Sequence, residues 1–384
     1  MLSTLAILFV VLQASLAVMI DMEGLPDTGL NTSTWNKGQL PPLENMYDLN
    51  DMQIAAKNVL SERFYASYRT GALNEYTYQA NLDVYRKIRL NGFSFRDVSK
   101  MNTVTTILGH TFTQPFFIAP AANAGHANKS AESSLASAAG KAGILYVPSI
   151  SSTLSIEQIA AAGVKGQVMF HQEYIWSDKD RMVDELDRIK AAGFKAIFLT
   201  VDNTGINGVR TRSMRYTEGS DTGHATDFSL SALAAFRNLT TLPIVPKGIK
   251  TWQDARTCME LGFPAIYVSN HGGRVLDGAP TAVEILLEIR KYVPEVFEKM
   301  EVYADGGVRR GTDAIALLAL GATAVGLGRP PMFANIWGEA GVSRMIDLFA
   351  QELLTSLRLM GVSDVKDLNL SYASTVNTNQ IVSM

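Results

Sequence analysis

The sequence has only one cysteine, Cys258, among 384 residues. One thiol cannot form a disulfide within the chain, so the fold must be held together by its hydrophobic core. The chain also lacks a long run of basic residues, and its net charge of −3 gives no reason to expect a nucleic-acid partner. With 47% hydrophobic and 18% charged residues, the composition is that of a globular protein and excludes a disordered or fibrous one.

The N-terminal segment MLSTLAILFVVLQASLAVMI contains no lysine or arginine. This apolar run is too short for a comfortable membrane span, and the small residues Ser15–Ala17 offer a cleavage point. We therefore expect a secretory signal peptide over residues 1–17 and export of the mature protein, although the absent basic residues leave open an uncleaved anchor or a buried helix. Glycosylation of a secreted protein would use the sequons at Asn31, Asn128, Asn238 and Asn369.

The rest of the chain has no abrupt change in composition. Residues 18–47 are rich in Pro, Gly, Ser and Thr, which is typical of an extended leader. Residues 48–100 have a helical pattern, with Asn50 or Asp51 as a cap, and predict an N-terminal helical extension. Residues 101–370 then form the main domain, and residues 371–384 form a C-terminal tail.

Short apolar segments recur through the main domain: FFIAPA, ILYVPS, GQVMFHQ, AIFLTVD, PIVPKG, AIYVSNHG, VYADGG and AVGLGR. Their apolar residues run continuously instead of alternating, which indicates strands covered on both faces, as in a parallel sheet. Helical segments such as AESSLASAAGKAG and KDRMVDELDRIKAAG separate them. This repeated strand–helix order predicts an α/β fold, a (β/α)8 TIM barrel. The long segment after the fourth strand, residues 203–241, is a candidate lid.

Two glycine-rich loops, DGGVRRG and GLGRP, follow the seventh and eighth predicted strands. In TIM barrels these loops commonly bind phosphate. Glycines let backbone N–H groups approach a phosphate, and Arg309 and Arg329 can donate paired hydrogen bonds. Either loop alone is a common turn, but the two at these positions predict a ligand that carries a phosphate.

Polar side chains gather at the other predicted strand ends. Taken singly, each has an ordinary explanation: Gln172 as a core amide, Lys247 as a solvated loop residue and Asp202 as a helix cap. Because the carboxyl ends of barrel strands share one mouth, together they indicate an active site. The set comprises Ala122, Ser149, Gln172, Tyr174, Thr200, Asp202, Lys247, His271 and Arg274.

Several of these segments closely resemble the FMN-dependent α-hydroxy acid dehydrogenase/oxidase family, which includes glycolate oxidase and lactate oxidase. The segments are SNHGGR, DGGVRRGTD, LALGA, GRP, FKAIFLTVD, PIVPKG and IAPAA. The resemblance covers about Asp48 to Asp364 and leaves no counterpart for the heme-binding domain of some members. It implies an enzyme that binds FMN and oxidises a 2-hydroxy acid to the 2-oxo product.

The resemblance also implies a role for each matching residue. The catalytic base falls on His271, its orienting carboxylate on Asp202 and the arginine that binds the substrate carboxylate on Arg274. Lys247 falls beside flavin N1, and Tyr174 in the active site. Further flavin contacts fall on Gln172, Thr200, Ser149 and, next to the isoalloxazine, Ala122. Phosphate binding falls on Asp305, Gly306, Gly307, Arg309, Gly328 and Arg329.

These roles suit the residue types. A histidine titrates near neutral pH and can take the proton that the hydroxyl or the α-carbon must lose, and a carboxylate stabilises the resulting imidazolium. A lysine can offset negative charge on the reduced flavin. The planar fork of an arginine makes two parallel hydrogen bonds to a carboxylate. SNHGGR thus combines a base and a carboxylate clamp on one turn.

The substrate end departs from the family pattern. Ser67 stands where members have a tyrosine that holds the substrate carboxylate, and Ser151 where they have a pocket tryptophan. The family's PTA is PAA here through Ala121, and its second substrate arginine corresponds only loosely to Arg210. Fewer large aromatic side chains leave room for a substrate bulkier than glycolate or lactate.

Two other functions stay open at this point. One is a flavin-binding protein with a degenerated substrate pocket, which Ser67 suggests. The other is a different phosphate-binding barrel, of the IMP dehydrogenase kind, whose loop cysteine has no match because Cys258 lies in a helical segment. The sequence leaves open whether oxygen or another acceptor reoxidises the flavin and whether the chain forms a homo-oligomer. No metal is expected.

Overall fold

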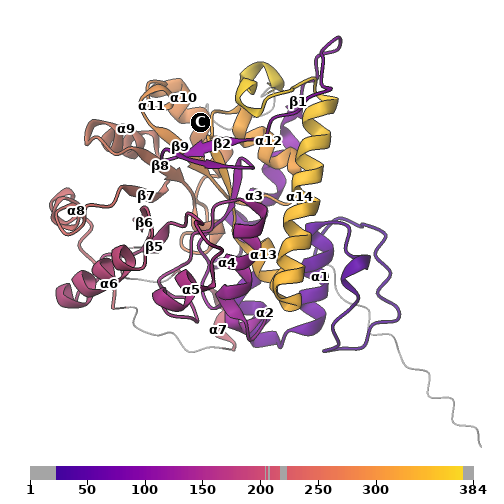
Figure 1. The fold of residues 1–384 in the computed structure, drawn as a ribbon, viewed down its shortest axis with the longest axis horizontal. Coiled ribbons are helices and arrows are strands. Elements are labelled where there is room, and N and C mark those ends of the chain that lie inside the picture. The colour runs from indigo at the N-terminus through magenta and orange to yellow at the C-terminus, as the bar shows by residue number, and fades with distance from the viewer. Residues whose placement is uncertain (1–22, 204, 206–207, 217–222, 375–384) are drawn as a thin grey trace, which may run out of the picture.

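The computed structural model describes residues 23–374 except 204, 206–207 and 217–222, and its centre is a curled parallel sheet (Figure 1). Neighbouring strands pair in the order β4-β10-β9-β8-β7-β6-β5. The strands are β4 (Phe116–Ile118), β5 (His171–Glu173), β6 (Ile197–Thr200), β7 (Ile244–Ile249), β8 (Ala265–Val268), β9 (Glu301–Ala304) and β10 (Ala324–Leu327).

The predicted second strand, ILYVPS, closes the barrel between β4 and β5. It is too irregular to count as a full strand, but Tyr146 bridges Ile118 on one side and Met169 on the other. Ser149 in turn bridges Gln172 in β5. The eightfold arrangement of a TIM barrel is therefore present, as predicted.

Helices cover the outside of the sheet. The two helical segments named from the sequence are present as α4 (Ala131–Ala142) and α6 (Lys179–Ala191). Further helices between strands are α5 (Ile156–Ala162), α9 (Trp252–Glu260) and α12 (Gly311–Ala319). The other helices outside the sheet are α8 (Leu230–Arg237), α10 (Ala282–Tyr292), α11 (Val296–Lys299) and α13 (Arg329–Ala334). The long α14 (Glu339–Leu359), which crosses Figure 1 from end to end, packs against α4 and α12.

The barrel interior is a packed aromatic core at one end and open at the other. Phe117, Phe198, Tyr267 and Tyr303 are fully buried and contact one another edge to face or stacked. Ile107 of β2 (Thr105–Ile107) and Phe112 of β3 (His110–Phe112) belong to the same cluster, so this antiparallel hairpin closes the amino ends of the strands. A ligand therefore has to enter at the carboxyl ends.

The N-terminal extension is helical, but for less of its length than predicted. It contains α1 (Leu49–Val59), α2 (Glu62–Arg69), α3 (Tyr76–Asp83) and a 3-10 turn that ends at Lys87. The prediction of helix up to residue 100 is wrong, because β1 (Arg89–Leu90) pairs with β11 (Ala373–Ser374) and the backbone of Phe93 bonds to Met360. The predicted tail thus begins as a strand.

The predicted signal peptide of residues 1–17 and most of the predicted tail lie outside the described residues. From residue 23 to 47 the chain has the 3-10 turn Leu43–Asn45 and further turns at residues 23–24, 33–34 and 37–38, and it is otherwise without helix or strand. No helix among residues 23–374, as far as they are described, is both long and apolar enough to cross a membrane.

Candidate active site

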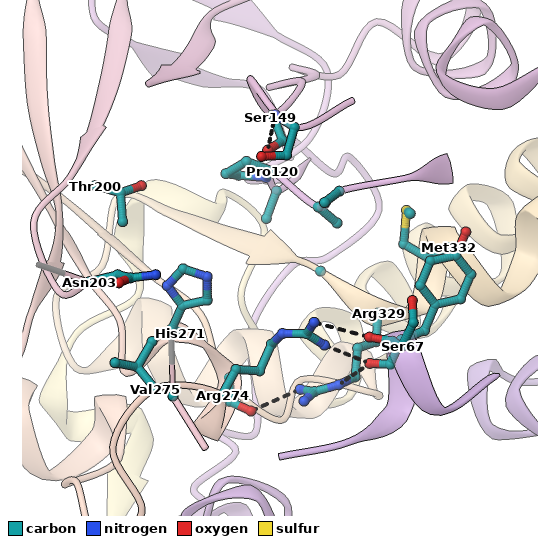
Figure 2. Close-up of a pocket in the computed structure, with 18 of the residues that line it drawn as sticks. Ser67, Pro120, Ser149, Thr200, Asn203, His271, Arg274, Val275, Arg329 and Met332 are labelled. Carbon is teal, nitrogen blue, oxygen red and sulfur yellow. Dashed lines mark hydrogen bonds between the residues drawn. The ribbon is translucent and has the colours of Figure 1, made fainter. Parts of the chain in front are cut away.

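A cavity of about 990 Å³ opens at the carboxyl ends of the barrel strands, large enough for a cofactor and a substrate together. Every predicted site residue lines it except Asp202, which lies behind His271. The cavity is roofed by α2 and by α7 (Thr211–Met214), which belongs to the segment expected to be a lid. Figure 2 shows its central residues.

His271 and Asp202 form a hydrogen-bonded pair beside this cavity. His271 Nδ1 lies 2.9 Å from Oδ1 of Asp202, so its Nε2 is the nitrogen left for a substrate. Burial lowers the pKa of His271 below its ordinary 6.5, against the opposing effect of Asp202. Burial by itself would raise the pKa of Asp202, but His271 and Lys247 lower it below 3.8. At neutral pH this is a neutral imidazole held by a carboxylate.

Two backbone features position the pair. Gly248, with φ +106°, follows Lys247 at a register shift between β7 and β8, and a Cβ there would lie 2.5 Å from the Asp202 side chain. His271 itself has φ +58°, which side-chain-bearing residues adopt only at a cost and which is concentrated at functional sites. The loop keeps this conformation through Asn270, whose side chain exchanges two hydrogen bonds with Asn81 of α3.

Three predicted flavin contacts lie in one hydrogen-bonded row. The Ser149 hydroxyl donates to Gln172 Oε1 at 2.9 Å, and Gln172 Nε2 donates to the Thr200 hydroxyl at 3.0 Å. Ala122 also lines the cavity. Lys247 is buried, and its ammonium has no hydrogen-bond partner among the described side chains and backbone groups. The three side chains form a polar wall of the cavity. The positive charge of Lys247 is not used by this row and is available to a ligand.

The loop after β9 has the character of an anion site. Arg309 is buried, and its Nε and one terminal nitrogen, Nη2, have no partner in the described structure. Asp305 Oδ1 is equally buried and unpartnered. Gly306 and Gly307 have φ of +107° and +77°. Gly307 is required for packing, because a Cβ would lie 1.9 Å from the Asn81 carbonyl oxygen.

Arg329 makes contacts that the sequence did not predict. Its three guanidinium nitrogens donate to the carbonyls of Tyr68, Gly272 and Thr70, so in this arrangement it holds the end of α2 against the His271 loop. Burial lowers its pKa to about 10, which leaves it charged at neutral pH. Gly328, beside it, lines the cavity with open space where a Cβ would stand.

The substrate arginine Arg274 also reaches the end of α2. Its terminal nitrogens donate to the carbonyls of Tyr68 and Ser67 at 3.0 Å, and Figure 2 shows Arg274 pointing toward Ser67. Arg210 donates to the Ser67 carbonyl at 3.1 Å. Burial lowers the pKa of Arg274 well below its usual range, with Arg210 and Arg329 adding to the effect. Two predicted carboxylate binders thus converge on Ser67.

Sequence reasoning missed the residues that surround Ser67. Its hydroxyl lies 3.4 Å from His126 Nδ1, and His126 stacks on Phe64 with ring centroids 4.2 Å apart. Arg63 lines the same end of the cavity, whereas the Tyr68 hydroxyl is bonded to the Asn123 carbonyl. None of these lies directly at a barrel strand end, where the sequence analysis looked for polar side chains. On the opposite wall, Tyr174 stacks on His224, also missed, at 3.9 Å.

Neither a metal site nor a reactive thiol accompanies the cavity. No three His, Cys, Asp or Glu side chains among the described residues are placed to hold an ion. Cys258 lies in α9 on the outside of the barrel, where burial raises its pKa to about 12.

Known proteins share this sequence and fold. Two segments, 56–228 and 217–375, match the family model described as FMN-dependent dehydrogenase. Glycolate oxidase 3 of Arabidopsis thaliana is 33% identical over 349 residues, which are 83% of this chain and 94% of that protein. L-lactate oxidase of Nostoc sp. is 36% identical over 357 residues, which are 85% of this chain and 97% of that protein.

Solved structures agree. The recombinant flavin-binding domain of baker's yeast flavocytochrome b2 superposes with a TM-score of 0.84 at 31% identity, over 87% of this chain and 88% of that one. A mandelate oxidase variant with 2-hydroxy-phenylacetamide superposes with a TM-score of 0.77 at 33% identity, over 84% of this chain and 96% of that one. With the cavity described above, these likenesses show that the chain belongs to the FMN-dependent α-hydroxy acid dehydrogenase family and is an FMN enzyme.

Proposed function

We propose that the protein oxidises 2-hydroxy acids larger than glycolate or lactate to 2-oxo acids, with His271 as the base. The observation that carries the proposal is the hydrogen bond between the neutral His271 imidazole and the Asp202 carboxylate, beside a cavity that also contains Arg274. Bound FMN would supply the two-electron oxidation, and oxygen or another acceptor would then reoxidise it.

The residues present fit FMN. The unpartnered nitrogens of Arg309 suit its phosphate, and Lys247 suits the negative charge of the reduced ring. Asp305 would repel a phosphate but can accept a hydrogen bond from a hydroxyl of the ribityl chain. The row Ser149–Gln172–Thr200 offers polar groups to the ring edge.

The chain's own residues then divide the work on the substrate. Arg274 binds the carboxylate and orients the α-carbon, after exchanging one or both carbonyl contacts for it. His271 Nε2 takes the proton that the substrate loses. Asp202 keeps Nδ1 as the protonated nitrogen and stabilises the imidazolium that forms.

The size of the substrate follows from the end of the cavity near α2. Ser67 and Ser151 both line it with short side chains. The Tyr68 hydroxyl donates a hydrogen bond to the Asn123 carbonyl and is not free for a substrate. Arg210 is close enough to bond the same carbonyl as Arg274, which provides a second cation for the carboxylate. A substrate with only two or three carbons, such as glycolate or lactate, would leave this end unfilled.

Anaerobic mixing of the yellow holoenzyme with individual 2-hydroxy acids tests the proposal. Loss of flavin absorbance near 450 nm, roughly the usual position for oxidised flavin, should occur with longer acids and return on admission of air or another acceptor. If FMN binds but no 2-hydroxy acid bleaches it, the chain is a flavin-binding protein with a degenerated pocket.

We also propose that the protein is secreted and glycosylated. The support is the apolar N-terminal segment and the exposed sequons Asn31, Asn238 and Asn369. N-terminal sequencing of the native protein should begin near Val18, and glycosidase treatment should lower its apparent mass. An intact Met1 on unglycosylated native protein would overturn this proposal.

A further inference from the structure

One wall of the cavity is a face of α2 with an unused positive charge. Arg63 and Ser67 both line the cavity and lie four residues apart, which places them one helical turn apart on one face. Arg63 makes no hydrogen bond or ion pair with any residue in the described part of the chain. Arg63 is exposed at the cavity, and a cation that lines a cavity without a partner is available to a ligand.

No carboxylate stands near enough to neutralise this charge. Among the residues that line the cavity, Asp305 is the one carboxylate, and it belongs to the loop after β9 at the anion site. Glu132 lies behind His126, but it is fully buried and accepts from the backbone N–H groups of Ala124, Thr153 and Leu154. The end of the cavity near α2 is therefore positive.

Ser67 connects this end to the carboxylate clamp. Its carbonyl accepts from Arg274 and Arg210, while its hydroxyl contacts His126, which Phe64 holds by stacking. Ser67 and Ser151, which both line the cavity, have short side chains. A substrate held at Arg274 can extend along Ser67 toward Arg63.

We infer that the substrate is a 2-hydroxy acid with a second carboxylate at the end of its side chain, bound by Arg63 and His126. This inference rests on the proposed function, since it names the substrate class of the same site. One helical turn separates Arg63 from Ser67 by about 5–6 Å. An extended carbon chain spans that length in roughly four to five bonds, so 2-hydroxyglutarate and 2-hydroxyadipate are the matching probes.

The experiment compares these two acids with uncharged acids of the same chain length, 2-hydroxypentanoate and 2-hydroxyhexanoate, each enantiomer separately, on the holoenzyme. The wild type should favour the dicarboxylic acids by at least about tenfold in kcat/KM, the ordinary scale of a charge-assisted contact. Arg63→Gln should remove that ratio mainly through KM, because a contact remote from the reacting atoms is equally strong before and in the transition state.

Lys129→Gln is the matched control. Lys129 is exposed, lies three residues after His126 and does not line the cavity, so its removal should leave the ratio intact. A wild type without preference for the dicarboxylic acids, or the same loss of ratio in Lys129→Gln and Arg63→Gln, would overturn the inference.

Failure of the inference is distinguishable from failure of the proposed function. If the uncharged acids bleach the flavin and the dicarboxylic acids do not, the proposed function stands and the inference falls. If neither class bleaches it, the proposed function falls, and binding decides the inference separately. Titration of 2-oxoglutarate and 2-oxopentanoate, followed by calorimetry, should then show tighter binding of the former in the wild type and equal binding in Arg63→Gln, whereas equal binding in both would contradict it.

Discussion

The imidazole of His271 and the carboxylate of Asp202 are joined by a 2.9 Å hydrogen bond, although the two residues are 69 positions apart and come from different strand ends. Removing the carboxylate affects both the pKa and the orientation of the base. Asp202 raises the pKa of His271 against the effect of burial, so Asp202→Asn should lower it further. The same change leaves the imidazolium without its partner.

For the wild type, a His271 pKa below 6.5 means that the base is unprotonated at neutral pH and gains a proton only as the pH falls below that value. Anaerobic flavin reduction should therefore lose rate on the acid side of pH 6.5. In Asp202→Asn this acid limb should move to lower pH while the plateau falls by roughly 100-fold or more. A limb that moves to higher pH would contradict the assigned pairing.

Arg309→Met should weaken FMN binding. Each lost hydrogen bond to the phosphate is worth about 1.5–3 kcal/mol, so the Kd for FMN should rise by roughly 10- to 150-fold. Arg310→Met is the matched control, because the neighbouring guanidinium points away from the cavity to Asp48 and Glu352. Fluorescence titration of the apoprotein with FMN measures both. Equal Kd values for the two variants would remove Arg309 from the phosphate site.

Gly248→Ala should damage the base more than the fold. Its new Cβ would lie 2.5 Å from Asp202 and would need a φ of +106°, so the carboxylate has to move. We expect a stability loss of about 1–3 kcal/mol, seen as a lower Tm with FMN still bound, and a larger fractional loss of reduction rate. Gly262→Ala controls for the positive φ alone, since nothing lies within 4 Å of a Cβ there. A similar rate in the two variants would show that Asp202 tolerates displacement.

Ser67→Tyr should shift specificity toward small acids. A tyrosine at this position of α2 would fill the space between Arg274 and His126 and bring a hydroxyl toward the substrate carboxylate. The kcat/KM ratio of lactate to a six-carbon 2-hydroxy acid should rise by about tenfold or more, the scale of one charge-assisted hydrogen bond plus lost space. Ser67→Ala, which adds no volume, should not change that ratio. An unchanged ratio in Ser67→Tyr would mean that substrates do not extend past α2.

Local patterns predict much of this molecule because they report on burial and strand ends. Continuous apolar runs identified the barrel strands, and polar residues directly after them line the cavity. The segment ILYVPS is the partial exception. Pro148 has no N–H to donate, and the pairing of this segment is reduced to isolated bridges at Tyr146 and Ser149.

Those patterns did not predict the cavity wall formed by α2. Its contacts join residues very far apart in sequence, such as Arg329 with the Tyr68 carbonyl, 261 positions away. A backbone carbonyl has no residue identity, so no motif announces that three arginines meet there. For the same reason the contacts of Arg329 with the end of α2 were not predicted.

The most direct test of the account is the rate of anaerobic flavin reduction in His271→Ala with a substrate that reduces the wild type. FMN should stay bound, because the groups suited to FMN come from Arg309, Lys247 and the row Ser149–Gln172–Thr200. The reduction rate should fall by roughly 100-fold or more, the usual scale for loss of a positioned base. Reduction at the wild-type rate, with full FMN content, would contradict the role of His271 and with it the proposed chemistry.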